Sequence, residues 1–224
     1  MIKGVFFDWG FTLAHPEPDR DMQFYQCAQE LGVSLPLKGL LKGVHEADNQ
    51  VPKGAPPRYS EDEDKAPFLK WWDVLLSYIG GNVPENTKLE ITKLAGARVK
   101  VAKWVLYDDV LPTIERLKEQ GLIIGLISNI SMDRAGLDRY LDFTITAKDV
   151  GAGKPERIIF STALRKADLA ASEVIYVGDQ YKIDVLGANR VGIKAILIDR
   201  YDLVSPTKGC PYISNLSELT NYLS

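Results

Sequence analysis

Asp8, Ser128, Lys154 and Asp179 are placed in the sequence where their side chains could act together on a phosphoryl group. Asp8, Ser128 and Asp179 each follow or end a short hydrophobic run that is typical of a strand, and Lys154 stands ahead of a predicted helix. In an open parallel α/β sheet, ligands bind beyond the carboxyl ends of the strands. We therefore expect one crevice to collect a nucleophilic carboxylate, a hydroxyl, a cation and a metal-binding carboxylate.

The elements that must position these residues alternate between strand and helix from about residue 109 onward. Such alternation is typical of a parallel sheet with crossover helices, and it predicts an α/β fold. The strand that leads to Asp8, about residues 2–7, is separated from the others by nearly a hundred residues. The later strands are expected at 122–127, 143–146, 174–177 and 194–198, and the helices near 112–120, at 132–140, from Pro155, at 183–191 and at 216–223.

The separating segment, about residues 15–106, has helical periodicity and no convincing strand. It predicts an all-helical unit inserted after the first strand. The apolar stripe of Phe68, Trp71 and Trp72 is expected to form the core of this unit rather than a substrate pocket. His15 is expected in a solvated loop, although it could assist a proton transfer.

Composition limits the classes of function. The chain has 224 residues, of which 46% are hydrophobic and 25% charged, as in ordinary globular proteins. A net charge of −3 argues against nucleic acid as the main partner. Cys27 and Cys210 give neither a disulfide framework nor zinc-ligand spacing. The absence of a charged-then-apolar leader and of a membrane-length apolar stretch favours a cytoplasmic protein, expected as a monomer or homodimer without a membrane partner.

Taken in order, the motifs resemble those of the haloacid dehalogenase superfamily over the whole chain. That family has an apolar strand before Asp-x-Asp-x-Thr-Leu or a variant, a strand ending in Ser or Thr, a Lys before a helix, and Gly-Asp-x-x-x-x-Asp. The matching residues are Asp8-Trp9-Gly10-Phe11-Thr12-Leu13, Ser128, Lys154-Pro155, and Gly178-Asp179 with Asp184. The resemblance implies a Rossmann-like core, residues 1–14 and 107–224, with a helical cap at 15–106. The Trp71-Trp72 pair and the Gly-Asp-Gln-Tyr sequence are most similar to the branch that includes the rhythmically-expressed-gene-product proteins.

The resemblance also implies a mechanism. Asp8 would attack phosphorus and form an aspartyl-phosphate, which water then hydrolyses. A carboxylate attacks phosphorus well only when the charge on the phosphoryl oxygens is neutralised. Lys154 would supply a positive charge to those oxygens, Ser128 a hydroxyl donor, and Asn129 or a backbone N–H a further donor.

Mg²⁺ is the implied cofactor. It prefers one or two carboxylates together with water and phosphate oxygens. Asp8, Asp179 and the Gly10 carbonyl would be its ligands. Asp184 would hold a metal-bound water or Lys154, unless it is only a carboxylate at a helix N-terminus.

Gly10 departs from the family pattern. Family phosphatases carry Asp at this place, which protonates the leaving oxygen and then activates water, and glycine can do neither. We favour a Mg²⁺-dependent phosphatase acting on a small phosphorylated metabolite. The alternatives are a haloacid-cleaving enzyme, a phosphonate-cleaving enzyme that would need a cap lysine (Lys38, Lys42 or Lys53), and a non-catalytic member that binds a phosphorylated ligand.

Overall fold

The computed structural model describes residues 1–51, 65–131, 135–203 and 209–223. These residues form two compact units. Unit 1 comprises Met1–His15 and Trp104–Ser224, and unit 2 comprises Pro16–Lys103.

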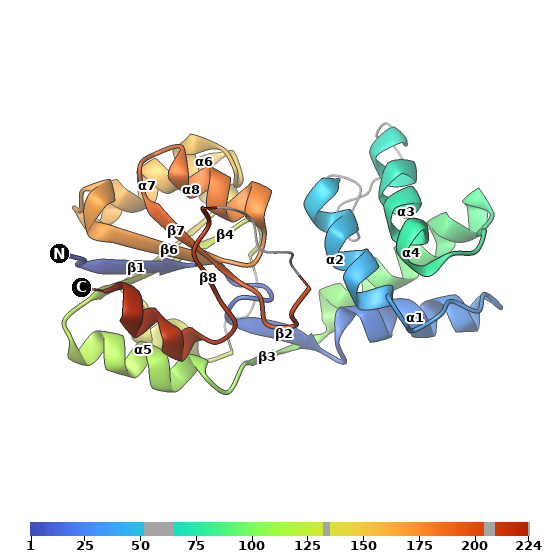
Figure 1. Ribbon diagram of the computed structural model, residues 1–224, viewed down its shortest axis with the longest axis horizontal. Helices are drawn as coiled ribbons and strands as arrows, with labels where there is room; N and C mark the ends of the chain where they lie inside the picture. The colour runs from blue at the N-terminus through green and yellow to red at the C-terminus, as the bar shows by residue number, and fades with distance from the viewer. Residues whose placement is uncertain (52–64, 132–134, 204–208, 224) are drawn as a thin grey trace. The chain divides into compact units, whose positions relative to one another are not determined.

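Unit 1 is built on a six-stranded sheet in the order β5-β4-β1-β6-β7-β8, in which every pairing is parallel. Short runs of buried residues form its central strands, as expected for strands that are covered on both faces. The first strand of the chain lies in the middle of the sheet, between two strands that come more than a hundred residues later (Figure 1). The strands are β1 (Gly4–Phe7), β4 (Ile123–Ser128), β5 (Phe143–Thr146), β6 (Val174–Gly178), β7 (Lys194–Ile198) and β8 (Tyr212–Ile213).

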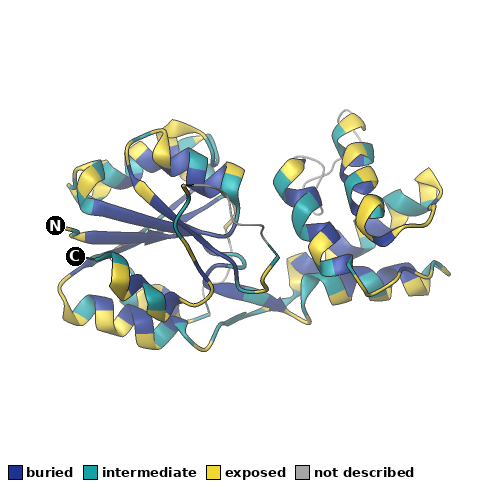
Figure 2. Ribbon diagram, viewed as in Figure 1, coloured by how far each residue is buried: buried dark blue, intermediate teal, exposed yellow. Residues whose placement is uncertain are grey.

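Helices cover both faces of this sheet. One face carries α5 (Val110–Glu119) and the C-terminal 3-10 helix Leu216–Tyr222, and the other carries α6 (Ala147–Val150), α7 (Arg157–Ala167) and α8 (Leu186–Asn189) (Figure 1). The two faces bury separate hydrophobic clusters, and β1 contributes alternate residues to them: Val5 and Phe7 to one, Phe6 to the other. Figure 2 shows the buried strands in dark blue between helices whose outer faces are exposed. This three-layer arrangement is Rossmann-like.

The described residues of unit 2 form four helices, α1 (Arg20–Glu30), α2 (Leu40–Gln50), α3 (Ala66–Ile79) and α4 (Glu85–Val101). Phe68, Trp71 and Trp72 are buried in its own hydrophobic cluster. The Trp71 indole donates to Asp48 Oδ1 (2.8 Å), and the Trp72 indole donates to Thr92 Oγ1 (3.1 Å). The apolar stripe on α3 therefore forms the core of the helical unit.

The expectation that residues 15–106 hold no strand is wrong at both ends of that segment. Strands β2 (Ala14–Glu17) and β3 (Lys103–Leu106) pair with each other in a separate two-stranded sheet. Each strand has four residues, too few for the alternation that identifies a strand in a sequence. Strand β8 was missed for the same reason.

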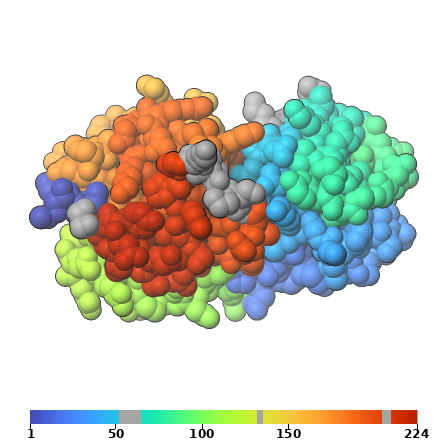
Figure 3. All heavy atoms as spheres, viewed as in Figure 1, coloured from blue at the N-terminus to red at the C-terminus, as the bar shows by residue number. Residues whose placement is uncertain are grey.

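Some predicted helices take other forms. The helix expected at 183–191 is a π-helical turn, Tyr181–Val185, followed by the single turn of α8. The C-terminal helix is a 3-10 helix that packs beside α5, and both reach the molecular surface (Figure 3). Of the helix expected at 132–140, Leu137–Tyr140 form a 3-10 helix, and residues 132–134 lie outside the described residues. Among the helices described, none is both long and apolar enough to cross a membrane.

Candidate active site

Three neighbouring strands bring the predicted residues to one edge of the sheet. Asp8 follows β1, Ser128 ends β4 and Asp179 follows β6, and β1 lies between the other two. The register places Phe7 opposite Leu126 on one side and Val177 on the other. The Asp8 amide continues the ladder by donating to the Val177 carbonyl (2.9 Å). The strand ends of a parallel sheet thus gather residues that are far apart in the sequence.

Lys154 lies at the centre of the site, with only 2% of its side chain exposed. Its ammonium donates to Asp8 Oδ1 (2.5 Å), Asp184 Oδ1 (2.7 Å) and the Tyr176 hydroxyl (2.9 Å). Burial alone would lower the pKa of Lys154, but the charges of Asp184 and Asp8 outweigh burial and raise it. The lysine therefore stays positively charged beside Asp8.

Tyr176 is the residue of this network that the sequence analysis missed. Its hydroxyl donates to Asp184 Oδ1 (2.8 Å) and accepts from Lys154, and the side chain is fully buried in β6. Burial, followed by the charge of Asp184, raises the pKa of Tyr176 well above its usual value, so the phenol keeps its proton. A tyrosine inside an otherwise aliphatic strand was the available signal, because a buried hydroxyl needs a partner.

Asp184 is held by backbone as well as side chains. Its Oδ2 accepts from the Gln180 amide (3.0 Å). A Cβ placed on Gly178 would come within about 2.4 Å of Asp184 Cγ, so the carboxylate fits only against glycine. This close approach explains the glycine of the Gly178-Asp179 pair and the return of the chain to Asp184.

Three carboxylates converge at the site: ligand atoms of Asp8, Asp179 and Asp184 all lie within 4.8 Å of one another. Burial, together with the charges of Asp8 and Asp184, raises the pKa of Asp179 well above its ordinary value. Burial also raises the pKa of Asp8, although Lys154 opposes this effect. Within the described chain, the buried Asp179 Oδ1 has no hydrogen-bond partner. Buried carboxylates with one unsatisfied oxygen are a donor set that suits a hard divalent cation such as Mg²⁺.

Asn129 and Ser128 contact the backbone near the site. The Asn129 side chain accepts from the Lys154 amide (2.6 Å) and donates to the Lys154 carbonyl (3.1 Å), so it orients the lysine. A Cβ on Gly153 would lie 2.7 Å from Asn129 Oδ1, so glycine is needed there. Ser128 Oγ accepts from the Ile130 amide (3.2 Å), and its own proton remains available to a ligand.

The segment after Asp8 forms a tight turn. The amides of Leu13 and Ala14 donate to the Trp9 carbonyl (2.9 and 3.1 Å), and Phe11 adopts a positive φ of 59°. A Cβ on Gly10 would meet the outer edge of the Trp104 indole at 3.5–3.6 Å. A side chain at position 10 would therefore point towards the Trp104 ring.

The remaining candidate residues are less directly involved. His15 lies half-buried in β2, where its ring stacks on Tyr107 with centroids 4.7 Å apart, so the expected solvated loop is wrong. Lys38 and Lys42 are exposed on the helical unit, and Lys53 lies outside the described residues.

Fold and site together define a class of hydrolase, and a family model confirms it. Residues 2–192 match the haloacid dehalogenase-like hydrolase model, and the chain belongs to this family. The fold of a predicted phosphoglycolate phosphatase from Haemophilus somnus is similar, with a TM-score of 0.67 at 16% identity over 100% of this chain and 98% of that one. A 2-haloacid dehalogenase from Pseudomonas syringae pv. Tomato is 26% identical, with a TM-score of 0.59 over 100% and 98% of the two chains.

Two relatives named as phosphatases are more similar in sequence to this chain than these two solved structures are. A glyceraldehyde 3-phosphate phosphatase of Methanothermobacter thermautotrophicus is 32% identical over 206 residues, covering 89% of this chain and 86% of the relative. A ribulose-1,5-bisphosphate 5-phosphatase of Halopiger xanaduensis is 32% identical over 136 residues, covering 53% and 57%. The chain spans only 57–59% of the length of several curated relatives, which include two phosphatases and a haloacid dehalogenase-like hydrolase domain-containing protein 3 of Danio rerio.

Proposed function

We propose that this hydrolase is a Mg²⁺-dependent phosphatase that acts on a small phosphorylated metabolite through an aspartyl-phosphate. The observation that carries the proposal is the buried group of Asp8, Lys154 and Asp179. The Asp8 carboxylate is paired with the Lys154 ammonium, and one oxygen of Asp179 has no hydrogen-bond partner in the part of the chain that the structure describes. A site of this charge pattern suits a phosphoryl group accompanied by a cation.

In the first step, a carboxylate oxygen of Asp8 forms a bond to phosphorus, and the bond from phosphorus to the leaving oxygen breaks. In the second, water attacks the same phosphorus, which releases inorganic phosphate and regenerates Asp8. Lys154 and the Ser128 hydroxyl stabilise the negative charge on the phosphoryl oxygens throughout. Tyr176 and Asp184 hold the Lys154 ammonium in place by hydrogen bonds of 2.9 and 2.7 Å.

Asp8, Asp179 and the Gly10 carbonyl would hold Mg²⁺, and Asp184 contributes to the same carboxylate group. When bound, the cation would offset the mutual repulsion of the carboxylates and the phosphate. The unsatisfied oxygen of Asp179 supports this assignment over the metal-free dehalogenase chemistry.

The names of the relatives favour phosphorylated sugars or trioses as the substrate class. The test is a screen of the purified chain against an aryl phosphate, glyceraldehyde 3-phosphate, ribulose 1,5-bisphosphate and other sugar phosphates, each with Mg²⁺ and with excess chelator. Phosphonoacetaldehyde and a 2-haloacid serve as controls for the two alternative chemistries. We expect Mg²⁺-dependent release of phosphate from at least one sugar phosphate.

The Asp8→Asn variant is the negative control, because it keeps the size of the side chain and removes the nucleophile. Release of halide in the presence of chelator would overturn the proposal in favour of a dehalogenase. If the chain binds a phosphorylated ligand but turns over none of these substrates, the non-catalytic alternative would be favoured instead.

A further inference from the structure

A buried arginine beside the active-site loop has no part in the mechanism above. Arg200 follows β7 by two residues, and 7% of its side chain is exposed. Nε and Nη2 of its guanidinium both donate to the Thr12 carbonyl, at 3.0 and 2.6 Å. The ring of Tyr107 packs against the guanidinium, with the ring centroid 3.8 Å from the central carbon.

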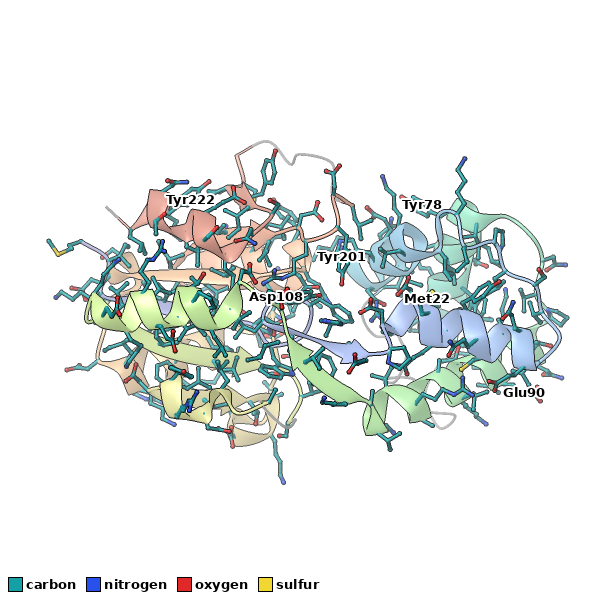
Figure 4. The ribbon with its side chains drawn as sticks, turned by 90° about the horizontal axis from the view of Figure 1, so that it is seen from below. Met22, Tyr78, Glu90, Asp108, Tyr201 and Tyr222 are labelled. Carbon is teal, nitrogen blue, oxygen red and sulfur yellow. The ribbon has the colours of Figure 1, made fainter. Side chains whose placement is uncertain are left out.

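Asp109 fixes the other side of the guanidinium. Its Oδ2 accepts from Arg200 Nη1 (3.1 Å) and from the Leu216 amide (2.7 Å). Asp109 immediately precedes α5, and Leu216 begins the C-terminal 3-10 helix, so both belong to the helical layer on one face of the sheet. Tyr201 and Asp108, the chain neighbours of the two ion-paired residues, mark this position in Figure 4.

The Thr12 carbonyl is a sensitive point at which to hold the active-site loop. Thr12 is fully buried, and it lies in the turn that the Trp9 carbonyl closes by accepting from Leu13 and Ala14. Phe11, with a positive φ, precedes it. Rotation of the Thr12 peptide would break both hydrogen bonds to Arg200 and change the path of residues 9–13, including the Gly10 carbonyl.

Stability alone is a weak reason for this arrangement, since buried ion pairs often contribute little compared with apolar residues of similar size. Two of the donors instead converge on a single carbonyl oxygen two residues beyond Gly10, and the rigid, planar guanidinium is well suited to fixing the orientation of that acceptor. We propose that Arg200 is a positioning residue, which holds the Thr12 peptide and so keeps the loop after Asp8 in the geometry that the reaction needs. The catalytic part of this inference rests on the proposed phosphatase function.

The experiment compares Arg200→Met and Arg200→Lys with the parent in the full-length chain. Arg139→Met is the matched control, because Arg139 also packs on a tyrosine ring (Tyr140, 4.8 Å) but is exposed. Steady-state rates are measured with an aryl phosphate. A displacement of about 1 Å in a reacting group can cost about 100-fold in rate, so we expect Arg200→Met to lower kcat by about 10- to 100-fold with KM within about twofold. Arg200→Lys, which keeps the charge but offers one donor nitrogen in place of the planar guanidinium, should recover part of kcat.

Hydrogen exchange provides a readout that does not depend on turnover. The amides of Leu13 and Ala14 should exchange faster in Arg200→Met than in the parent, while those of the central strands stay unchanged. Arg139→Met should alter neither exchange nor rate. Unchanged exchange at residues 9–14 together with parent kcat in Arg200→Lys and Arg200→Met would overturn the inference.

If Arg200→Met does not fold, Arg200→Lys decides: parent kcat and parent exchange in that variant overturn the inference, and a lower kcat with faster loop exchange supports it. If the parent lacks phosphatase activity, the proposed function fails. Faster loop exchange in the Arg200 variants would still support the positioning role.

Discussion

Replacing Gly10 by aspartate should create a proton donor that this chain lacks at that position. The structure accommodates the change. Gly10 does not have a positive φ, so its backbone conformation allows a side chain. The new Cβ would lie 3.5–3.6 Å from Trp104, an ordinary van der Waals distance. The carboxyl group would extend beside the indole edge. Partial burial against an apolar ring disfavours the charged form, so the pKa of the new carboxyl should rise, which suits a general acid.

The size of the gain depends on the leaving group. General acid–base catalysis typically contributes about 10²- to 10⁴-fold, or about 2.7 to 5.4 kcal/mol. Alkyl phosphates have basic leaving oxygens that need the proton. For these substrates we therefore expect Gly10→Asp to raise kcat by up to about 10²- to 10⁴-fold. Aryl and acyl phosphates leave readily without a proton, and their rates should change much less.

The assay measures kcat/KM against leaving-group pKa for the parent and for Gly10→Asp. The parent should show a steep decrease with increasing pKa, and the variant a shallower one. Gly10→Asn is the matched control, because its side chain has a similar shape and cannot donate a carboxylic proton. Equal and shallow slopes in parent and variant would refute the reasoning, since another group would then already protonate the leaving oxygen.

Four further predictions concern the residues of the site. Asp8→Asn should abolish turnover with an unchanged circular dichroism spectrum, because an amide does not attack phosphorus; near-parent activity would exclude Asp8 as the nucleophile. Mg²⁺ should raise the Tm of the parent but not that of Asp179→Ala. At a Mg²⁺ concentration of 100 times Kd, the unfolding free energy of the parent should rise by up to about 2.7 kcal/mol. An equal Tm shift in both proteins would contradict the proposed metal site. The folded-state pKa of Asp179 is raised above 3.8, so the metal-free protein should lose stability as the pH rises from there through the raised value. The Mg²⁺-induced Tm shift should accordingly shrink as the pH is lowered through that raised value, and a constant shift would argue against proton competition. Tyr176→Phe should lower the unfolding free energy by about 1.5–3 kcal/mol in urea titrations, because Lys154 and Asp184 lose a buried partner; a change below about 0.5 kcal/mol would show that the hydroxyl is dispensable.

The sequence was most informative where local pattern and topology agree. Asp8, Ser128 and Asp179 end or follow apolar runs, and parallel pairing brings such strand ends together whatever their separation in the chain. Short or irregular elements were less predictable. Strands β2 and β3 have four residues each, and the turn that holds Asp184 is π-helical, so neither shows a regular period.

Contacts between side chains that are distant in the chain could not be predicted from the sequence. Asn129 or a backbone N–H was expected to add a donor to the phosphoryl oxygens; the structure adds that the Asn129 side chain hydrogen-bonds the Lys154 backbone 25 residues away. Tyr176 was given no functional role because a tyrosine in a strand is typical of a hydrophobic core. Only the fold shows that Lys154 and Asp184 lie beside its hydroxyl. The role of Asn129 in orienting Lys154 depends in turn on glycine at position 153.

The sequence by itself determined the α/β class, the order of the motifs and the residue types available for phosphoryl chemistry. These features depend only on local runs of apolar residues and on the spacing of the polar residues at their ends. Tertiary structure alone decided which groups neutralise one another, which oxygen of Asp179 lacks a partner among the described residues, and that Arg200 hydrogen-bonds Thr12 from 188 residues away. Charge pairing and burial depend on distances in space, and these are set only when the strands and helices pack.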